Sequence, residues 1–399
     1  MTGGGENHTL AAMEISHGNG AALVTVLHLI TGLGAGGAER QLAALATRSD
    51  PARIRHVVVS LLDAGNWGPR LREAGIELHT LDLKRKWMAP LALPRLASLV
   101  RSIRGDIIQT WLYHADLLGL VTGTLTGRPV IWTLRSSHLR LDIYGLETQL
   151  LVRLLTRLSG CPRAVVANAA AGESWHRSIG YRARRWVVIP NGVDTGAFHP
   201  DPAARAAVRQ ELGLPDDAKL IGNVSRHDPM KDHPTLLAAF RAQAGRAWLL
   251  LAGDGASLDN PILARQIVEA GIIPDRVLRL GQRSDVPRLL AALDVAVLSS
   301  AFGEGFPNVV AEGMACGIPS IATDIGDAAQ IIGDCGVAVP ITDPAALGAG
   351  IAKLLDLDPA ARADLAQRSR ARIEQEFSIP AMIAAYSRLY DEILTKRKV

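Results

Sequence analysis

Short apolar runs rich in Val, Ile and Leu recur along the first half of the chain, and segments with helical spacing, such as residues 38–48, separate them. Strands buried on both faces read as continuous apolar runs, whereas half-buried strands alternate apolar and polar positions. The pattern therefore predicts a parallel α/β sheet. Its expected strands lie at residues 22–30, 56–62, 106–113, 129–134 and 164–168.

The second half repeats this pattern, so the chain of 399 residues is expected to form two doubly wound domains. The stretch PNGVDTGAFHPDP at residues 190–202 is rich in turn residues and predicts a linker. We expect an N-terminal domain over 21–195, a C-terminal domain over 196–378 and a closing helix over 379–399. The strands expected in the second domain lie at residues 219–225, 248–252, 277–281, 293–299 and 318–323.

The chain's beginning and its cysteines favour a cytoplasmic protein. Residues 1–20 are rich in glycine and polar residues and lack an apolar core, which predicts a disordered tail rather than a signal peptide. The three cysteines, an odd number without close pairing, indicate reduced thiols. No stretch reaches the roughly 20 uninterrupted apolar residues of a membrane-spanning helix.

Charge and aromatic content argue against nucleic acid as a partner. The formal net charge is +4 and the aromatic fraction is 4%. Nucleic-acid grooves combine strong positive charge with aromatic stacking platforms, and no run here alternates basic and aromatic residues.

Polar or glycine residues follow four strands of the second predicted sheet. Parallel α/β sheets bind ligands at the carboxyl ends of their strands, so these turns should meet at one edge. In the third turn, Asp285 is placed to cap the next helix. The four turns are Arg226 to Lys231, Gly253 to Gly255, Gln282 to Asp285, and residues 302–317, FGEGFPNVVAEGMACG.

The stretch FGEGFPNVVAEGMACG has the pattern of a loop that leads into a helix. Pro307 suits the first helical position and Gly317 the exit. Asn308 and Glu312 are four residues apart and share one helical face, while Glu304 lies on the loop before them. Both carboxylates are therefore expected to face one site.

Such a loop suits a nucleotide sugar. Glycines at positions 303 and 305 allow close backbone approach, and free amides at a helix start attract anions. Carboxylates accept hydrogen bonds from sugar hydroxyls, and Arg226 and Lys231 suit a diphosphate. The alternatives are solvated surface charges, or the acid–base pair of a glycosidase, whose two carboxyls would flank one bond. The spacing is compatible with a glycosidase, but diphosphate-binding cations do not fit one.

The stretch SSAFGEGFPNVVAEGMACGIPSIATDIGDAAQII closely resembles the signature of retaining family-four glycosyltransferases, marked by two glutamates separated by seven residues. GLGAGGAERQL, VVIPNGVD and LGQRSDVPRLLAALDVAVLSS also resemble this family. The similarity runs from about residue 23 to the end. It implies the GT-B fold, in which two Rossmann-like domains face each other across a cleft.

The resemblance implies a role for each matching residue. Glu304 would contact hydroxyls of the donor sugar and Glu312 the ribose, while Arg226 and Lys231 would bind the diphosphate and stabilise it as it leaves. Arg283 would lie near the base. The backbone of the remaining positions would approach the donor sugar or its phosphates: Gly305, Phe306, Pro307, Asn308, Gly36 and Gly37.

One departure from the family concerns a His-x-His pair, which here reads Gln109 and Trp111. His114 is the nearest substitute for the histidine that contacts the reacting sugar, and the alternative is an ordinary loop histidine. Arg135, after the next strand, either meets an acceptor phosphate or caps a helix.

The resemblance also implies a mechanism. Fixed cations would stabilise the departing nucleoside diphosphate, and no clear nucleophile appears, so we expect retention without a covalent intermediate. No cofactor or metal is expected, because no clustered His/Cys ligand set occurs. A nucleotide-sugar epimerase and a non-catalytic carbohydrate-binding homologue are the rival interpretations. The latter would be expected to have lost Arg226, Lys231 or Glu312, and all three are present.

The segment from Lys84 to Arg104 carries six basic residues and no acid. Leu96, Val100 and Ile103 share one helical face. This segment would either rest on an anionic membrane, as enzymes with lipid-linked acceptors do, or form a sheet-covering helix with a basic outer face. The expected acceptor is a lipid-linked or polysaccharide precursor.

Overall fold

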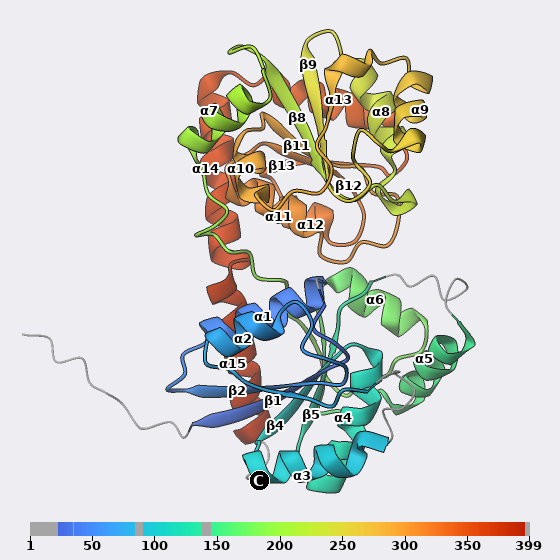
Figure 1. Ribbon diagram of the computed structural model, residues 1–399, viewed down its shortest axis with the longest axis vertical. Coiled ribbons are helices and arrows are strands. Elements are labelled where there is room, and N and C mark those ends of the chain that lie inside the picture. The colour runs from blue at the N-terminus through green and yellow to red at the C-terminus, as the bar shows by residue number, and fades with distance from the viewer. Residues whose placement is uncertain (1–22, 35, 84–90, 138–144, 396–399) are drawn as a thin grey trace, which may run out of the picture.

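The computed structural model describes residues 23–34, 36–83, 91–137 and 145–395. They form two lobes, each built around one parallel sheet, and long helices join the lobes along one side (Figure 1). The expected disordered tail at 1–20 and the basic residues at 84–86 lie outside the described residues.

The N-terminal lobe holds a seven-stranded sheet in the order β3-β2-β1-β4-β5-β6-β7. The five strands predicted there are confirmed. The edge strands β3 and β7 were missed, because β3 is partly buried without a continuous apolar run and β7 is only three residues long. The strands are β1 Val24–Ile30, β2 Ile54–Ser60, β3 Glu77–Thr80, β4 Ile107–Trp111, β5 Val130–Leu134, β6 Ala164–Ala167 and β7 Trp186–Val188.

Helices cover both faces of this sheet. One face packs against α1 and α15, and the other packs against α3, α4 and α5. The predicted closing helix is α15, whose Met382, Tyr386 and Tyr390 are buried with Val26 and Trp111 of the N-terminal sheet. The helices of this lobe are α1 Gly37–Arg48, α2 Gly68–Glu73, α3 Leu93–Ile103, α4 Tyr113–Thr126, α5 Leu146–Leu158, α6 Ala170–Ser178 and α15 Ile379–Thr395.

The C-terminal lobe holds a six-stranded sheet in the order β10-β9-β8-β11-β12-β13. Its five predicted strands are confirmed, whereas the partly exposed edge strand β13 was missed. The strands are β8 Lys219–Val224, β9 Ala247–Ala252, β10 Val277–Arg279, β11 Val295–Leu298, β12 Ser320–Thr323 and β13 Gly336–Val339. The α-helices are α7 Pro202–Glu211, α8 His233–Arg241, α9 Pro261–Glu269, α10 Val286–Ala291, α11 Asn308–Ala315, α12 Ala328–Ile332, α13 Pro344–Leu355 and α14 Pro359–Glu376.

Each sheet has one point at which the strand order reverses, between β1 and β4 and between β8 and β11. Ligands of doubly wound sheets bind outside the carboxyl ends of the strands at such a point. The two carboxyl edges face each other, because the hydroxyl of Ser137, after β5, donates a hydrogen bond to the carbonyl of Glu304, after β11. The fold therefore places two potential ligand-binding edges opposite one another.

The helix α3 lies in the basic segment and covers the sheet. Leu96, Val100 and Ile103 are buried in the core, and Arg101 and Arg104 are exposed. The interpretation as a sheet-covering helix with a basic outer face is confirmed for α3. None of the helices in the described ranges is both long and apolar enough to span a membrane.

The chain crosses between the lobes twice, and the two crossings are hydrogen-bonded to each other. The Val193 amide donates to the Phe377 carbonyl at 2.7 Å, and the Ile379 amide donates to the Val193 carbonyl at 3.0 Å. Gly192 fits here because a Cβ on it would lie 2.7 Å from Ile379 Cα. Its amide and carbonyl both bond to the side chain of Gln41 on α1.

We predict that Gly192→Ala destabilises the protein by about 1–3 kcal/mol, because the added methyl group meets backbone atoms that cannot move without breaking the crossing. Chemical denaturation followed by circular dichroism measures the change. The control is Gly245→Ala, where a Cβ meets nothing within 4 Å, and it should be neutral or stabilising by up to about 1 kcal/mol. Equal stability of the two variants would contradict the prediction.

Candidate functional site

The loop after β11 holds Glu304 in a partly buried ion pair with Lys231. Lys231 Nζ lies 2.5 Å from Glu304 Oε1, and the hydroxyl of Ser300 donates to the same oxygen at 2.7 Å. The side chains of Lys231 and Glu304 are only 14% and 10% exposed. Because β8 and β11 are neighbours, their carboxyl ends bring these two predicted site residues together.

Backbone contacts fix the shape of this loop. Gly303 has a φ of +80° and Gly326 a φ of +62°, both in the left-handed region that favours glycine. A Cβ on Gly326 would lie 2.5 Å from the Gly305 carbonyl oxygen, which accepts a hydrogen bond from the Asp327 amide at 2.8 Å. No described group accepts a hydrogen bond from the amides of Glu304 and Gly305. These amides and the start of α11 are therefore available to a ligand.

The start of α11 differs in detail from the prediction. Pro307 occupies the N-cap, so Asn308 is the first helical residue. Gly317 follows the helix with a φ of +70°, as expected of an exit residue. Phe306 is 4% exposed and packs against Phe377 with ring centroids 5.7 Å apart, so its side chain belongs to the core. Only the backbone of Phe306 can contribute to binding.

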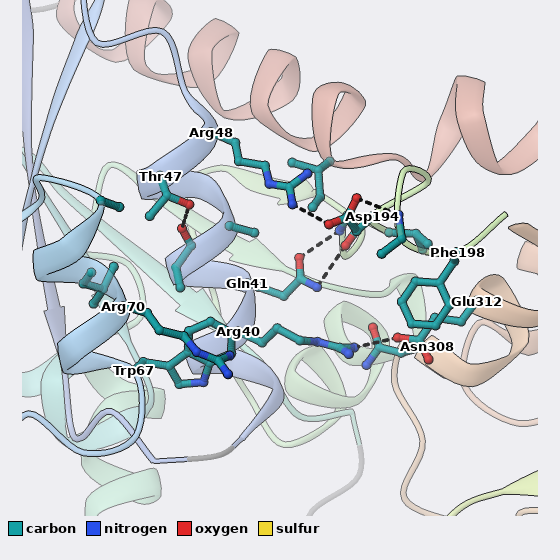
Figure 2. Close-up of a pocket in the computed structure, with 18 residues that line it drawn as sticks. Arg40, Gln41, Thr47, Arg48, Trp67, Arg70, Asp194, Phe198, Asn308 and Glu312 are labelled. Carbon is teal, nitrogen blue, oxygen red and sulfur yellow. Dashed lines mark hydrogen bonds and ion pairs between the residues drawn. The ribbon is translucent and has the colours of Figure 1, made fainter. Parts of the chain in front are cut away.

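Glu312 lies on the second turn of α11 and forms an ion pair with the N-terminal lobe. Arg40 Nη2, from α1, lies 3.0 Å from Glu312 Oε1 (Figure 2). Burial raises the pKa of Glu312, and the charge and hydrogen bond of Arg40 oppose that rise. Arg40 lies in the stretch GLGAGGAERQL, and its pairing with Glu312 was not predicted from the sequence.

Asn308 is connected to the N-terminal lobe by side-chain hydrogen bonds. Asn191 Nδ2 donates to Asn308 Oδ1 at 2.9 Å, and Arg135 Nη2 donates to Asn191 Oδ1 at 2.6 Å. The Arg135 guanidinium also lies 5.3 Å from the ring centroid of Trp111. Arg135 thus faces the region between the lobes and does not cap a helix.

Arg226 stands on the same loop as Lys231 but is exposed. Its side chain is 58% exposed, and Nε lies 3.4 Å from Asp228 Oδ2. The His227 amide donates to the Asp254 carbonyl at 2.7 Å, which joins the turn after β8 to the turn after β9. These two turns therefore meet as predicted, and Arg226 retains donors for a ligand.

The turn after β10 forms an ion-pair cluster of its own. Arg283 contacts Asp285 at 2.8 Å and Glu211 of α7 at 3.0 Å, and the bond from Arg283 lowers the pKa of Asp285 to about 2. Asp285 occupies the N-cap of α10, as predicted, but its carboxylate accepts hydrogen bonds from Arg283 and Arg288 and makes no side-chain cap bond. The contact between Arg283 and a base remains a prediction.

The N-terminal residues of the predicted site lie on α1 and α4. Gly36 is the N-cap of α1, and Gly37 is its first residue, with open space within 4 Å of a hypothetical Cβ. His114 is the second residue of α4 and is half-buried at the carboxyl end of β4. Its contact with the reacting sugar remains a prediction.

The positions that replace the family's histidine pair are in the core. Gln109 and Trp111 are 0% exposed. Gln109 Nε2 donates to Thr133 Oγ1 at 2.9 Å, and Trp111 Nε1 donates to His28 Nδ1 at 3.2 Å. Because neither side chain reaches the surface, neither can contact a reacting sugar.

Asp327 provides a further connection between the two carboxyl edges, and a cavity lies beside the Arg40–Glu312 pair. The Asp327 carboxylate accepts from the amides of Ala170 and Ala171, at the start of α6, at 2.7 and 2.9 Å. A cavity of about 350 Å³ lies between α1, α2, the linker and α11, next to the Arg40–Glu312 pair (Figure 2). The described residues contain no group of three or more His, Cys, Asp or Glu side chains arranged to hold a metal ion.

Solved structures of similar architecture include a protein from Anabaena, Alr3699/HepE in complex with UDP, with a TM-score of 0.81 and 23% identity over 92% of this chain and 100% of that one. A glycosyltransferase from Rickettsia africae has a TM-score of 0.81 and 20% identity, covering 94% of this chain and 99% of its own. With the two facing sheets, these similarities establish the GT-B fold.

Sequence comparison identifies the family. The model of Glycosyltransferase Family 4 matches residues 35–197, and that of Glycosyl transferases group 1 matches residues 218–357. A D-inositol 3-phosphate glycosyltransferase from Mycolicibacterium smegmatis is 33% identical over 52% of this chain and 48% of its own, so the match spans about half the length of that relative. The Thermobispora bispora protein of the same name is 32% identical over 80% of this chain and 78% of its own. The chain belongs to the group 1, family-four glycosyltransferases.

Proposed function

We propose that the protein transfers a hexose-type sugar from a nucleoside-diphosphate sugar to an acceptor hydroxyl, with retention of the anomeric configuration. The observation that carries this proposal is the partly buried Lys231–Glu304 pair beside the open amides of the loop before α11. A fixed cation, a carboxylate and unpaired amides at one point suit a sugar bonded to a diphosphate.

Each group has a distinct part in donor binding. Lys231 has three N–H donors and gives one to Glu304, so it can also bind a diphosphate oxygen. Arg226, exposed on the same loop, supplies a second cation. Glu304 and the amides beside it would bind the sugar, and Glu312 would accept hydrogen bonds from the ribose. These assignments follow the family resemblance.

Related proteins support a nucleotide-sugar donor. The Anabaena protein, which this chain resembles in fold, was crystallised with UDP and with UDP-glucose. The relatives in Mycolicibacterium and Thermobispora are named for transfer of a glycosyl group to D-inositol 3-phosphate. We infer the same class of donor here, with the base and the sugar to be found by titration.

In the proposed reaction the acceptor oxygen forms a bond to the anomeric carbon as the bond from that carbon to the β-phosphate oxygen breaks. The electron pair of the broken bond remains on the phosphate, and the acceptor's proton passes to the departing phosphate. Lys231 and Arg226 stabilise the negative charge that develops on the departing phosphate. Electrostatic stabilisation of this kind is usually the largest single contribution to catalysis.

We predict that one of UDP, GDP and ADP binds the wild-type protein and that Arg226→Ala weakens this binding about 10- to 100-fold. A charged hydrogen bond contributes about 1.5–3 kcal/mol, and 1.36 kcal/mol corresponds to tenfold. Titration calorimetry measures both affinities. The control, Lys219→Ala, removes an exposed cation at the start of β8 and should bind as the wild type does. If no nucleotide binds, the donor site is wrong and a non-catalytic carbohydrate-binding role takes precedence.

We predict that, with a donor sugar carrying the nucleotide found by titration and an acceptor that the enzyme uses, the first product formed keeps the anomeric configuration of the donor. Proton NMR at early times reads this directly. Lys231→Met should lower kcat about 100-fold or more, because it removes a charge that acts mainly on the leaving group. A product with the inverted anomeric configuration would contradict the proposed route. Conversion of the nucleotide sugar in the absence of any acceptor would indicate an epimerase instead of a transferase.

We further propose that the acceptor is lipid-linked and that α4 and α5 rest on an anionic membrane. Leu146, Leu150 and Leu154 recur every fourth residue on α5 and are 66%, 53% and 41% exposed. Val121 and Leu125 of the neighbouring α4 are 37% and 57% exposed. Both helices cover the same face of the sheet, and we refer to these five exposed side chains together as the α4–α5 surface.

Basic side chains border the α4–α5 surface. Arg153 and Arg157 are exposed on α5, and Arg101 of α3 donates to the Leu125 carbonyl at 3.2 Å. The exposed acid on α5 is Glu147. Leucines bordered by arginines fit an anionic bilayer, whereas a symmetric pairing with a second copy would bring these arginines together.

We predict that the protein sediments with vesicles containing phosphatidylglycerol and that binding weakens as salt rises. The double variant Leu150→Ser/Leu154→Ser should bind at least about tenfold more weakly, because burying one leucine contributes about 1.5–3 kcal/mol. Leu258→Ser, which changes a 69% exposed leucine in the C-terminal lobe, is the control. Binding that is insensitive to salt and to the double variant, or a dimer that the double variant dissociates, would refute the membrane proposal.

A further inference from the structure

The ion pair between Arg40 and Glu312 joins the two lobes at the proposed ribose site. Arg40 projects from α1 of the N-terminal lobe, and Glu312 lies on α11 of the C-terminal lobe (Figure 2). The Glu312 side chain is 9% exposed, whereas that of Arg40 is 41% exposed. The arginine therefore reaches a buried carboxylate from a position that solvent and ligands can also reach.

The surroundings of Glu312 offer it little other electrostatic support. Arg48 and Arg70 line the same cavity, but Arg48 pairs with Asp194, and Arg70 lies 5.1 Å from the ring centroid of Trp67. Cys316, the C-cap residue of α11, lies one turn beyond Glu312, and burial together with the charge of Glu312 raises the pKa of its thiol to about 12. In the described part of the chain, Arg40 is the cation that contacts the carboxylate of Glu312.

A ribose hydroxyl donates its hydrogen bond best to an ionised carboxylate, and an isolated buried carboxylate tends to take up a proton. We propose that Arg40 is a positioning residue of the donor site, which holds Glu312 ionised and aimed at the ribose from the opposite lobe. The donor site of the C-terminal lobe is then complete only when α1 is in place. This inference rests on the proposed role of Glu312 in donor binding.

A purely structural tie between the lobes would not need Arg40. Gln41, the next residue of α1, holds the linker through two hydrogen bonds with Gly192, at 3.1 and 2.9 Å. Arg48, two turns along the same helix, holds the linker through Asp194. These contacts fix α1 independently, so the distinct consequence of removing Arg40 falls on the charge of Glu312.

The test is titration calorimetry of wild type, Arg40→Met and Arg40→Lys with whichever of UDP, GDP and ADP the wild type binds most tightly, between pH 6 and 8.5. Loss of Arg40 removes the interaction that lowers the pKa of Glu312, so the carboxyl is protonated over more of this range. Arg40→Met should bind about tenfold more weakly at pH 6.5 and recover as pH rises. Arg40→Lys keeps the charge and should restore most of the affinity.

Proton release on binding gives a second readout. Repeating the titrations in two buffers of different ionisation enthalpy counts the protons, and the nucleotide's own contribution cancels between variants. Arg40→Met should release more protons than wild type near neutral pH, and this excess should vanish in Arg40→Met/Glu312→Gln. Because that excess depends on a titrating carboxyl, a merely weakened fold would not produce it.

The matched control is Arg48→Met, which removes the other ion pair of α1 and leaves Glu312 untouched. It should show neither the pH-dependent loss nor the excess proton release. The inference is wrong, while the donor site stands, if Arg40→Met and Arg48→Met show the same nucleotide affinity and proton release. It is also wrong if the weaker nucleotide binding of Arg40→Met does not change with pH. If the wild type binds none of the three nucleotides, the proposed function itself fails.

Discussion

The proposed donor site depends on two carboxylates that are largely removed from bulk water and are each paired with a cation. An ionised carboxylate is costly to bury unless a cation and hydrogen-bond donors face it. Glu304 receives Lys231 and Ser300 from the carboxyl ends of β8 and β11, within its own lobe. Glu312 receives Arg40 from the opposite lobe. The partners of Glu304 therefore all come from the C-terminal lobe, whereas the ion pair of Glu312 requires both lobes.

The two sheets meet this requirement through their topology. In each, the strand order reverses beside the central strand, and the loops on either side of that reversal diverge and leave room for a ligand. Gly326 packs its backbone against the carbonyls of Glu304 and Gly305, where any side chain would collide. The loop before α11 is therefore held in place by close backbone contacts at Gly326.

The connection between the lobes is a further constraint on the site. The chain leaves the N-terminal lobe through Val193 and returns through Ser378, and the two crossings pair with each other. Because α15 is built into the core of the N-terminal lobe, any relative movement of the lobes must bend both crossings at one place. Arg40, Gln41 and Arg48 of α1 all contact residues at or beyond these crossings. A relative movement of the lobes would therefore change the contacts of α1.

Local pattern in the sequence determined the fold class, ten of the thirteen described strands, the turn residues that follow the strands and the helix that carries Glu312, because apolar strands and glycine-dependent turns leave a periodic or residue-specific signature. The edge strands β3, β7 and β13, which are three or four residues long, were not distinguished by this pattern. The pattern also did not identify the cations that pair with the two glutamates. Lys231 and Glu304 are 73 residues apart, and Arg40 and Glu312 lie in different lobes. Tertiary structure decided which cation faces which carboxylate, and that the Asp285 carboxylate binds the side chains of Arg283 and Arg288 instead of the first amides of α10. An ion pair depends on distance in space, and sequence spacing does not encode that distance.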